Sequence, residues 1–135
     1  MKSPNKITLP MVLDAIGKQP YYHMVKGDKG YDRSKRVAHT YGFNYEETWN
    51  LDYSMICFIL PRLVWLRDHT HSYPPTYICG KQMTYKGWID ILNTIINGLF
   101  IYVTVDEYVS HECINKQKWV TAKQLLFDYF EHLWD

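Results

Sequence analysis

The spacing of apolar residues between Trp88 and Tyr102 is the feature that most constrains the fold. These residues recur at intervals of three and four, which places them on one face of a helix. They are Trp88, Ile91, Leu92, Ile95, Leu99 and Tyr102. Thr84 stands where an N-cap for this helix is expected. The β-branched run from Ile101 to Val105 also fits a strand, so the helix is predicted up to about Tyr102.

A second long helix is predicted over residues 45–69. Asn44 and Glu47 have the spacing of a capping box at its start. One side of this helix is apolar and consists of Trp49, Tyr53, Ile56, Leu60, Leu63 and Val64. The stretch 55–60 is apolar all round, which is typical of a central helix that is buried on several sides.

Pro61 interrupts the apolar period of this segment. It removes one backbone donor and crowds the carbonyl group of Cys57, four residues earlier. Because the period resumes at Leu63, we expect a kinked but continuous helix. The alternative is a pair of helices that are divided at Leu60.

Residues 71–83, between the two long helices, are expected to form a loop, and two shorter helical patterns complete the prediction. Thr8 can cap a helix that ends near Gly17. Residues 116–134 carry a broad apolar face, formed by Trp119, Ala122, Leu126, Phe130 and Leu133. We therefore predict an all-α fold, a compact helical bundle of about four helices in a single domain that spans residues 1–135.

Residues 18–40 are expected to form a polar loop or a mobile N-terminal arm. The first 40 residues carry eight basic and three acidic side chains, a net charge of +5, whereas residues 41–135 carry a net charge of −4. No helical or strand period extends over a useful length of the arm. A solvated connector is the simplest interpretation, and a basic rim for an acidic partner is the alternative.

Composition limits the class of partner. The 15 Lys and Arg against 14 Asp and Glu give a net charge of +1, which disfavours duplex nucleic acid. Aromatic residues make up 16%, a level typical of recognition surfaces. The apolar stretch 88–105 contains Asp90 and other polar residues, so we expect no membrane association. Three cysteines and the lack of a signal-peptide pattern favour a reducing cytoplasm.

The sequence contains no motif that names a reaction. The patterns GxSxG, GxxxxGK[ST] and GxGxxG are absent. His69 and His71 are weak candidates for a metal site, because zinc sites favour paired CxxC or histidines four apart on a helix. Carboxylates that could meet as an acid–base pair are Glu46, Glu47, Asp52 and Asp90. We expect no cofactor and no catalysis, with a metal-dependent or acid–base hydrolase as an alternative.

Several side chains suit a nucleotide-like ligand. Arg62 and Arg67 stand near aromatic residues, and arginine with an aromatic ring commonly holds an anionic, ring-containing ligand. A surface arginine whose stem covers a ring is the alternative. A polar stripe of Asp90, Asn93 and Asn97 could bind base edges or face water. The candidate ligand-binding residues are Trp49, Asp52, Arg62, Arg67, Tyr73, Asp90 and Asn93.

The chain resembles a group of uncharacterised small proteins encoded by bacteriophages. The motifs that carry the resemblance are YGF at 41–43, ETWNLDY at 47–53, LPRL at 60–63, HTHSYP at 69–74 and FDYFEHLW at 127–134. The resemblance covers roughly residues 41–135. It implies a phage origin and a role inside the infected cell, in the host cytoplasm, and it carries no agreed activity or catalytic residues.

Two kinds of binding function follow from these expectations. Small phage proteins without enzymatic motifs commonly neutralise host defences, and this chain would do so by sequestering a nucleotide-like signal or by capping a host defence protein. The alternative is a protein-interaction or virion-associated module with no small-molecule ligand. Its interface, and that of an expected homo-oligomer, would use the aromatic side chains of the last helix, Phe127, Phe130 and Trp134.

Overall fold

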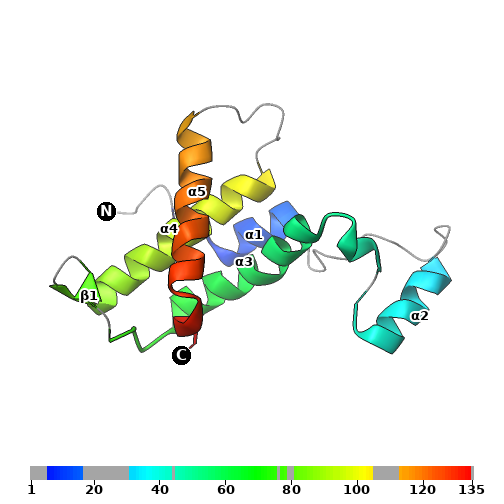
Figure 1. Cartoon of the computed structure of the whole chain (residues 1–135), viewed down its shortest axis with the longest axis horizontal. Coiled ribbons are helices and arrows are strands. Elements are labelled where there is room, and N and C mark those ends of the chain that lie inside the picture. The colour runs from blue at the N-terminus through cyan, green and yellow to red at the C-terminus, as the bar shows by residue number, and fades with distance from the viewer. Residues whose placement is uncertain are drawn as a thin grey trace.

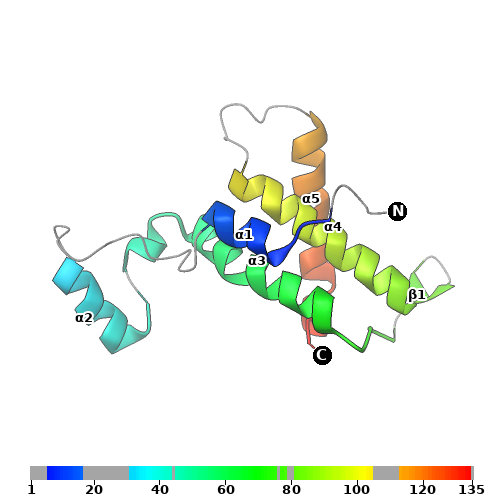
Figure 2. The same cartoon turned by 180° about the vertical axis from the view of Figure 1, so that it is seen from behind.

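Helices account for almost all of the regular structure in the computed structural model, which describes residues 6–16, 31–43, 45–75, 77–78, 81–104 and 113–134 (Figures 1 and 2). The helices are α1 (Leu9–Ile16), α2 (Tyr31–Tyr41), α3 (Leu51–His69), α4 (Tyr85–Thr104) and α5 (Cys113–Asp128). Two short 3-10 helices are η1 (Tyr45–Thr48) and η2 (Phe130–His132). The predicted all-α, compact helical fold is confirmed.

The predicted loop at 71–83 contains one small irregularity. Strands β1 (Tyr77–Ile78) and β2 (Lys81–Gln82) pair antiparallel, with Tyr77 opposite Gln82. Two residues on each side make this a hairpin tip rather than a sheet, so the described part of the chain remains a helical protein.

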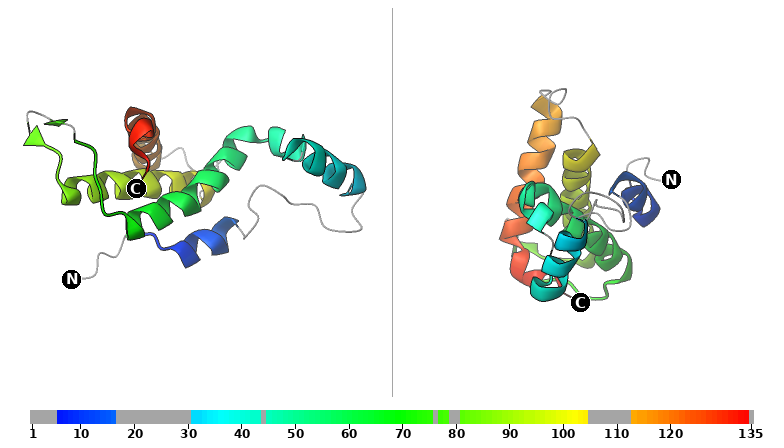
Figure 3. Two further views of the ribbon diagram at one scale, coloured as in Figure 1. Left: turned by 90° about the horizontal axis from the view of Figure 1, so that it is seen from below. Right: turned by 90° about the vertical axis from the view of Figure 1, so that its right-hand side faces the viewer.

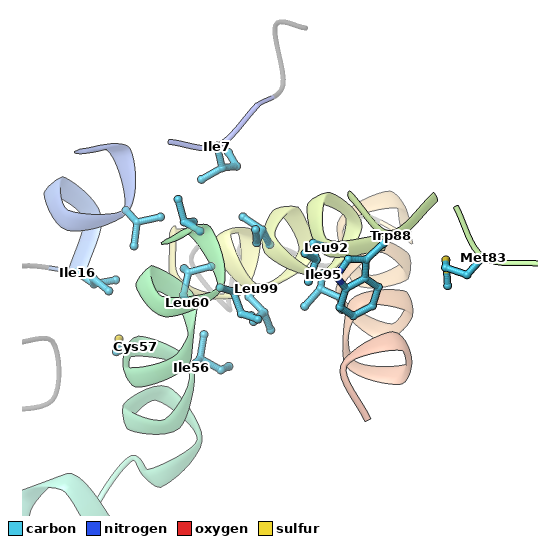
Figure 4. Packing of buried hydrophobic residues seen from close by; sticks show 14 residues of the cluster. Ile7, Ile16, Ile56, Cys57, Leu60, Met83, Trp88, Leu92, Ile95 and Leu99 are labelled. Carbon is cyan, nitrogen blue, oxygen red and sulfur yellow. The ribbon is translucent and has the colours of Figure 1, made fainter. Parts of the chain in front are cut away.

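Helix α4 lies at the centre of the fold. It packs against α5, α3 and α1, and α5 crosses it in Figure 1. Trp88, Leu92, Ile95 and Leu99 are fully buried along it, as the spacing of three and four predicts. Figure 4 shows Leu99 beside Leu60 of α3, while Trp88 lies at the end of the cluster farther from α1 and α3. The predicted cap is also present, because the Gly87 amide donates to Thr84 Oγ1 over 3.0 Å.

By length and composition alone, α4 is the one helix in the described residues that could cross a membrane. In this fold it is the central helix, covered by α3 on one side and α5 on the other. It continues as helix up to Thr104, so the strand alternative for residues 101–104 is not realised.

Gly98 allows α4 and α5 to approach closely. A Cβ atom at this position would overlap the Cβ of Ala122 and lie 2.6 Å from the backbone oxygen of Lys118. Gly98 itself is buried, as is Ala122. Two small residues therefore set the distance between the two helices that share the largest contact.

Helix α3 passes through Pro61 without ending, as predicted for a continuous segment. Its α-helical part begins at Leu51, later than the predicted start at residue 45. Residues 45–48 form η1 instead, and η1 packs against α2 and α3. Asn50 precedes the helix and makes no side-chain cap hydrogen bond. The predicted cap residue, Asn44, lies outside the described residues.

The expectation that α3 is buried on several sides is wrong. One face, centred on Leu60, is buried against α1 and α4. Met55 and Phe58 are 59% and 51% exposed because no other described helix covers the opposite face. Cys57 is fully buried, as expected for a small core residue, and burial raises the pKa of its thiol.

The prediction of a loop over residues 18–40 is wrong for its second part. Residues 31–41 form α2, and residues 18–30 lie outside the described segments. Apolar periodicity gave no sign of α2 because its residues are mostly polar. Asp32 in its first turn and His39 in its last turn both complement the helix dipole. The helix packs against η1 and lies apart from α1, α4 and α5 in Figure 3.

The last predicted helix, residues 116–134, is divided in the structure. Helix α5 ends at Asp128, and η2 follows at Phe130–His132. The half-buried Tyr129 lies at this break, with its ring 5.7 Å from that of Trp88 on α4. Aromatic packing against α4 therefore continues across the change of helix type.

Candidate functional site

The seven predicted ligand-binding residues are distributed along the fold. Trp49 lies in the turn before α3, and Asp52 lies at the start of that helix. Arg62 lies in the middle of α3 and Arg67 near its end. Tyr73 follows in the loop, and Asp90 and Asn93 belong to α4. Asp52 and Arg67 are about 22 Å apart along the helix axis, given the rise per residue. Of these seven residues, Arg67 and Asn93 are hydrogen-bonded to each other.

The Arg67 guanidinium is the centre of a buried polar cluster. Arg67 is 3% exposed, although it carries a full positive charge. Its Nη1 donates to Asn93 Oδ1 over 3.0 Å, and its Nε donates to Asp68 Oδ1 over 3.0 Å. Lys6 Nζ approaches the same carboxylate oxygen at 4.0 Å. Nη2 is buried and has no hydrogen-bond partner in the described residues.

This cluster fastens the end of α3 to the middle of α4. The Asp68 carboxylate compensates the buried charge of Arg67, and the Asn93 side chain accepts a hydrogen bond from the guanidinium Nη1. The N–H groups of Nη2 are the part of the guanidinium for which the described residues supply no acceptor. The pair of Arg67 and Asn93 therefore has a structural role, and Nη2 could still donate to a water, a carbonyl or an anionic oxygen.

Asp52 takes part in a second link between α3 and α4. The Tyr102 hydroxyl donates a hydrogen bond to Asp52 Oδ2. This bond, together with the backbone amide of Tyr53, holds the pKa of the Asp52 carboxyl below its ordinary value. Asp52 is therefore ionised at neutral pH. A general acid needs a raised pKa, so the lowered pKa of Asp52 does not support the alternative of an acid–base hydrolase.

Arg62 is exposed and is engaged by its own helix. Its Nη1 donates to the Phe58 carbonyl oxygen over 2.6 Å, and its guanidinium carbon lies 3.8 Å from the centre of the Phe58 ring. Arg62 therefore matches the alternative to ligand binding given above, in which a surface arginine packs over an aromatic ring. A comparable pair follows, because the Trp65 and His69 rings stack at 3.9 Å.

These pairs belong to one continuous surface, which we call the α3 stripe. It consists of Leu51, Met55, Phe58, Arg62, Trp65 and His69. All six residues are exposed, and they lie opposite the buried face of α3. Sequence reasoning missed this surface, although the alternating intervals of four and three were a readable signal.

A second exposed apolar surface lies at the end of α5 and in η2. Phe127, Phe130 and Trp134 are 64%, 56% and 62% exposed, and we call them the C-terminal aromatic group. The Phe127 and Phe130 rings stack at 6.2 Å. Asp128 and Glu131 follow Phe127 and Phe130 directly in the sequence, and both are exposed. The structure thus places the three predicted interface residues at one end of the molecule.

The remaining candidates lie at the surface. Trp49, Tyr73 and Asp90 are exposed, and Asp90 contributes its backbone oxygen to a hydrogen bond from Thr94. His69 Nδ1 is 2.9 Å from the Trp65 carbonyl oxygen, and His71 is exposed. Within the described segments, no group of three or more His, Cys, Asp or Glu side chains is placed to hold a metal ion.

Comparison with known proteins gives no relative. No family model, no curated protein and no solved structure matches this chain. The case for a function therefore rests on the chain's own surfaces.

Proposed function

We propose that this protein acts by binding another protein through its C-terminal aromatic group. In an infected cell, this binding counters a host defence by capping a host defence protein. The observation that carries the proposal is the exposure of Phe127, Phe130 and Trp134, each more than half open to solvent. Single exposed apolar side chains are common, but three at one end of a small fold are typical of an interaction surface.

The chemistry of the surface defines the partner. Aromatic side chains contribute most when they enter apolar pockets at the centre of an interface. Asp128 and Glu131, the residues that follow Phe127 and Phe130 in the sequence, are exposed and add negative charge to this end of the molecule. The partner is therefore a protein with an apolar groove that is lined at its edge by lysine or arginine, because complementary charge favours association.

A second candidate function is the sequestration of an anionic, nucleotide-like molecule. The observation that favours it is the buried Nη2 of Arg67, for which the described part of the chain supplies no acceptor. An arginine with a free donor can pair with a phosphate or carboxylate oxygen. Asp68 already neutralises this guanidinium, so a second anion would gain less there than beside an unpaired arginine.

A complementation experiment tests the leading proposal. A phage that lacks this protein is plated on a host that carries the defence, and the protein is supplied from a plasmid. We expect the wild type to restore plating, and the F127A/F130A double variant to fail. The two side chains are exposed, so the variant should retain the thermal stability and the helical circular dichroism of the wild type.

The matched control is Tyr41→Ala, which removes another exposed aromatic side chain, 69% exposed, from α2. This variant should restore plating as the wild type does. Full restoration by F127A/F130A would refute the proposed surface. Loss of plating by Asn93→Leu alone, with a stable fold, would favour the second candidate, because that change alters the Arg67 cluster and leaves the C-terminal aromatic group intact.

A further inference from the structure

The α3 stripe has the residue spacing of a coiled-coil seam. Its members are separated by four, three, four, three and four residues, an average close to the 3.5 residues that keep one face turned toward a partner helix. An ordinary core-facing helix has a broader apolar face. In heptad terms, Leu51, Phe58 and Trp65 occupy d positions, and Met55, Arg62 and His69 occupy a positions.

We propose that a second copy of this chain packs its own α3 against this stripe, antiparallel, across a two-fold axis that passes between Phe58 and Arg62 of the stripe. The symmetry of the stripe supports a second copy as the occupant. Its six members are placed evenly about the centre of α3, so reversal of the helix direction superimposes the stripe on itself. A two-fold interface requires such self-complementarity.

The side chains that would meet in this register are compatible. Phe58 would face Arg62 of the second copy, so each guanidinium, already 3.8 Å from one ring, would lie between two rings. Met55 would face Trp65 of the second copy, a favourable contact between sulfur and an aromatic ring. Leu51 would face His69 of the second copy.

Charge selects this direction over the parallel one. A parallel pair would place Arg62 against Arg62 of the second copy within the seam, and like charges in a seam are unfavourable. The antiparallel register places them in neighbouring layers, about 6 Å apart along the helix axis, and pairs each with an aromatic ring. The half-buried Ile59 and Leu66 flank the stripe and would extend the apolar contact.

The expected dimer is of modest strength. The stripe is about 27 Å long, given the helical rise per residue. A helix pair of that length buries on the order of 1,000 Å² in total, which is the lower end for specific interfaces. Dissociation on dilution is therefore expected. The α3 stripe is separate from the C-terminal aromatic group, so this inference goes beyond the proposed function and does not depend on it.

Sedimentation equilibrium over a range of concentrations tests the surface. We expect the wild type to reach a dimer of twice 16.2 kDa at high concentration. Met55→Glu and Trp65→Lys should each give a monomer with unchanged circular dichroism, because both side chains are exposed. Phe127→Glu places the same kind of charge on the C-terminal aromatic group and should leave the dimer intact.

A mixing experiment tests the register. In the antiparallel arrangement, a Met55→Glu chain and a Trp65→Lys chain form one layer with an ion pair and one layer with the native side chains. Native mass spectrometry of the mixture should therefore show the heterodimer, while each variant alone is monomeric. A parallel register would bring no such ion pair together.

Three results would overturn the proposal. The first is a wild type that remains monomeric at high concentration. The second is a dimer that persists in the Met55→Glu and Trp65→Lys variants or is lost in Phe127→Glu, since either result would place the interface elsewhere. The third is the absence of a heterodimer in the mixture, which would exclude the antiparallel register. Loss of the dimer with normal phage complementation would leave the proposed function standing.

Discussion

Replacement of Gly98 by alanine sets helix propensity against helix packing. Alanine is more favourable than glycine in a helix interior by about 1 kcal/mol, so propensity alone predicts a gain in stability. The new methyl group would overlap Ala122 and lie 2.6 Å from the Lys118 backbone oxygen. Neither atom belongs to a flexible side-chain end, so relief requires a shift of α5.

The packing cost should exceed the gain in propensity. Overpacking of a well-filled core costs about 1–3 kcal/mol, and we expect the upper part of that range because backbone atoms are involved. The net prediction is a loss of about 2 kcal/mol in the free energy of unfolding after the propensity gain is subtracted. Urea denaturation followed by circular dichroism measures this quantity.

Two further variants make the test specific. Gly87→Ala is the matched control, because its methyl group would meet only side-chain atoms, Thr84 Oγ1 at 3.2 Å and Met83 Sδ at 3.5 Å. Its stability should equal or exceed that of the wild type by up to about 1 kcal/mol, because the propensity gain meets no overlap with backbone atoms. The change Ala122→Gly in the Gly98→Ala background should recover part of the loss. A Gly98→Ala variant more stable than the wild type would refute the close approach of α4 and α5.

The other predictions concern the polar links between helices. Tyr102→Phe should raise the pKa of Asp52 toward its ordinary value, as followed by a carboxyl titration in nuclear magnetic resonance; an unchanged pKa would mean that the hydroxyl is not the cause. Because the folded pKa is lowered, the Asp52 contribution is present above the ordinary value of 3.8 and lost as the pH falls through the folded value, and this acid dependence should weaken in Tyr102→Phe. Asn93→Leu should cost about 1–3 kcal/mol in urea denaturation, since it leaves the buried Arg67 with one partner fewer, whereas Arg67→Met should cost less; the reverse order would contradict this account of the cluster. Burial raises the pKa of Tyr53 to about 12, so the wild type should lose stability between about pH 10 and pH 12, and Tyr53→Phe should show a smaller loss over that interval.

The central part of the fold could be predicted because one physical signal dominates there. Apolar spacing identified α4 from Trp88 onward, and Thr84 gave its start. Helix α2 was not predicted because most of its residues are polar. Apolar periodicity identifies only helices that bury one face. The start of α3 was misplaced because a capping-box spacing marks a local preference, while contact with α1 and α4 decides where the helix continues.

The binding surfaces were harder to predict than the helices. The sequence distinguishes apolar from polar residues but does not say which apolar residues find a covering element. Met55 and Phe58 were therefore expected in the core and lie at the surface instead. Arg67 and Asn93 were both selected from the sequence, yet their hydrogen bond depends on the packing of α3 against α4. The packing of helices determines which residues from distant segments meet. Residue spacing within one helix does not reveal that packing.

The most direct test of the proposed function is site-specific photo-crosslinking in infected cells. A photoreactive phenylalanine analogue replaces Phe127 in one chain and Tyr41 in a control chain, both of which are exposed. The account predicts one host protein attached at residue 127, absent at residue 41, and distinct in mass from a second copy of the chain. Adducts that are absent at residue 127, or that are the same at both positions, would contradict binding through the C-terminal aromatic group.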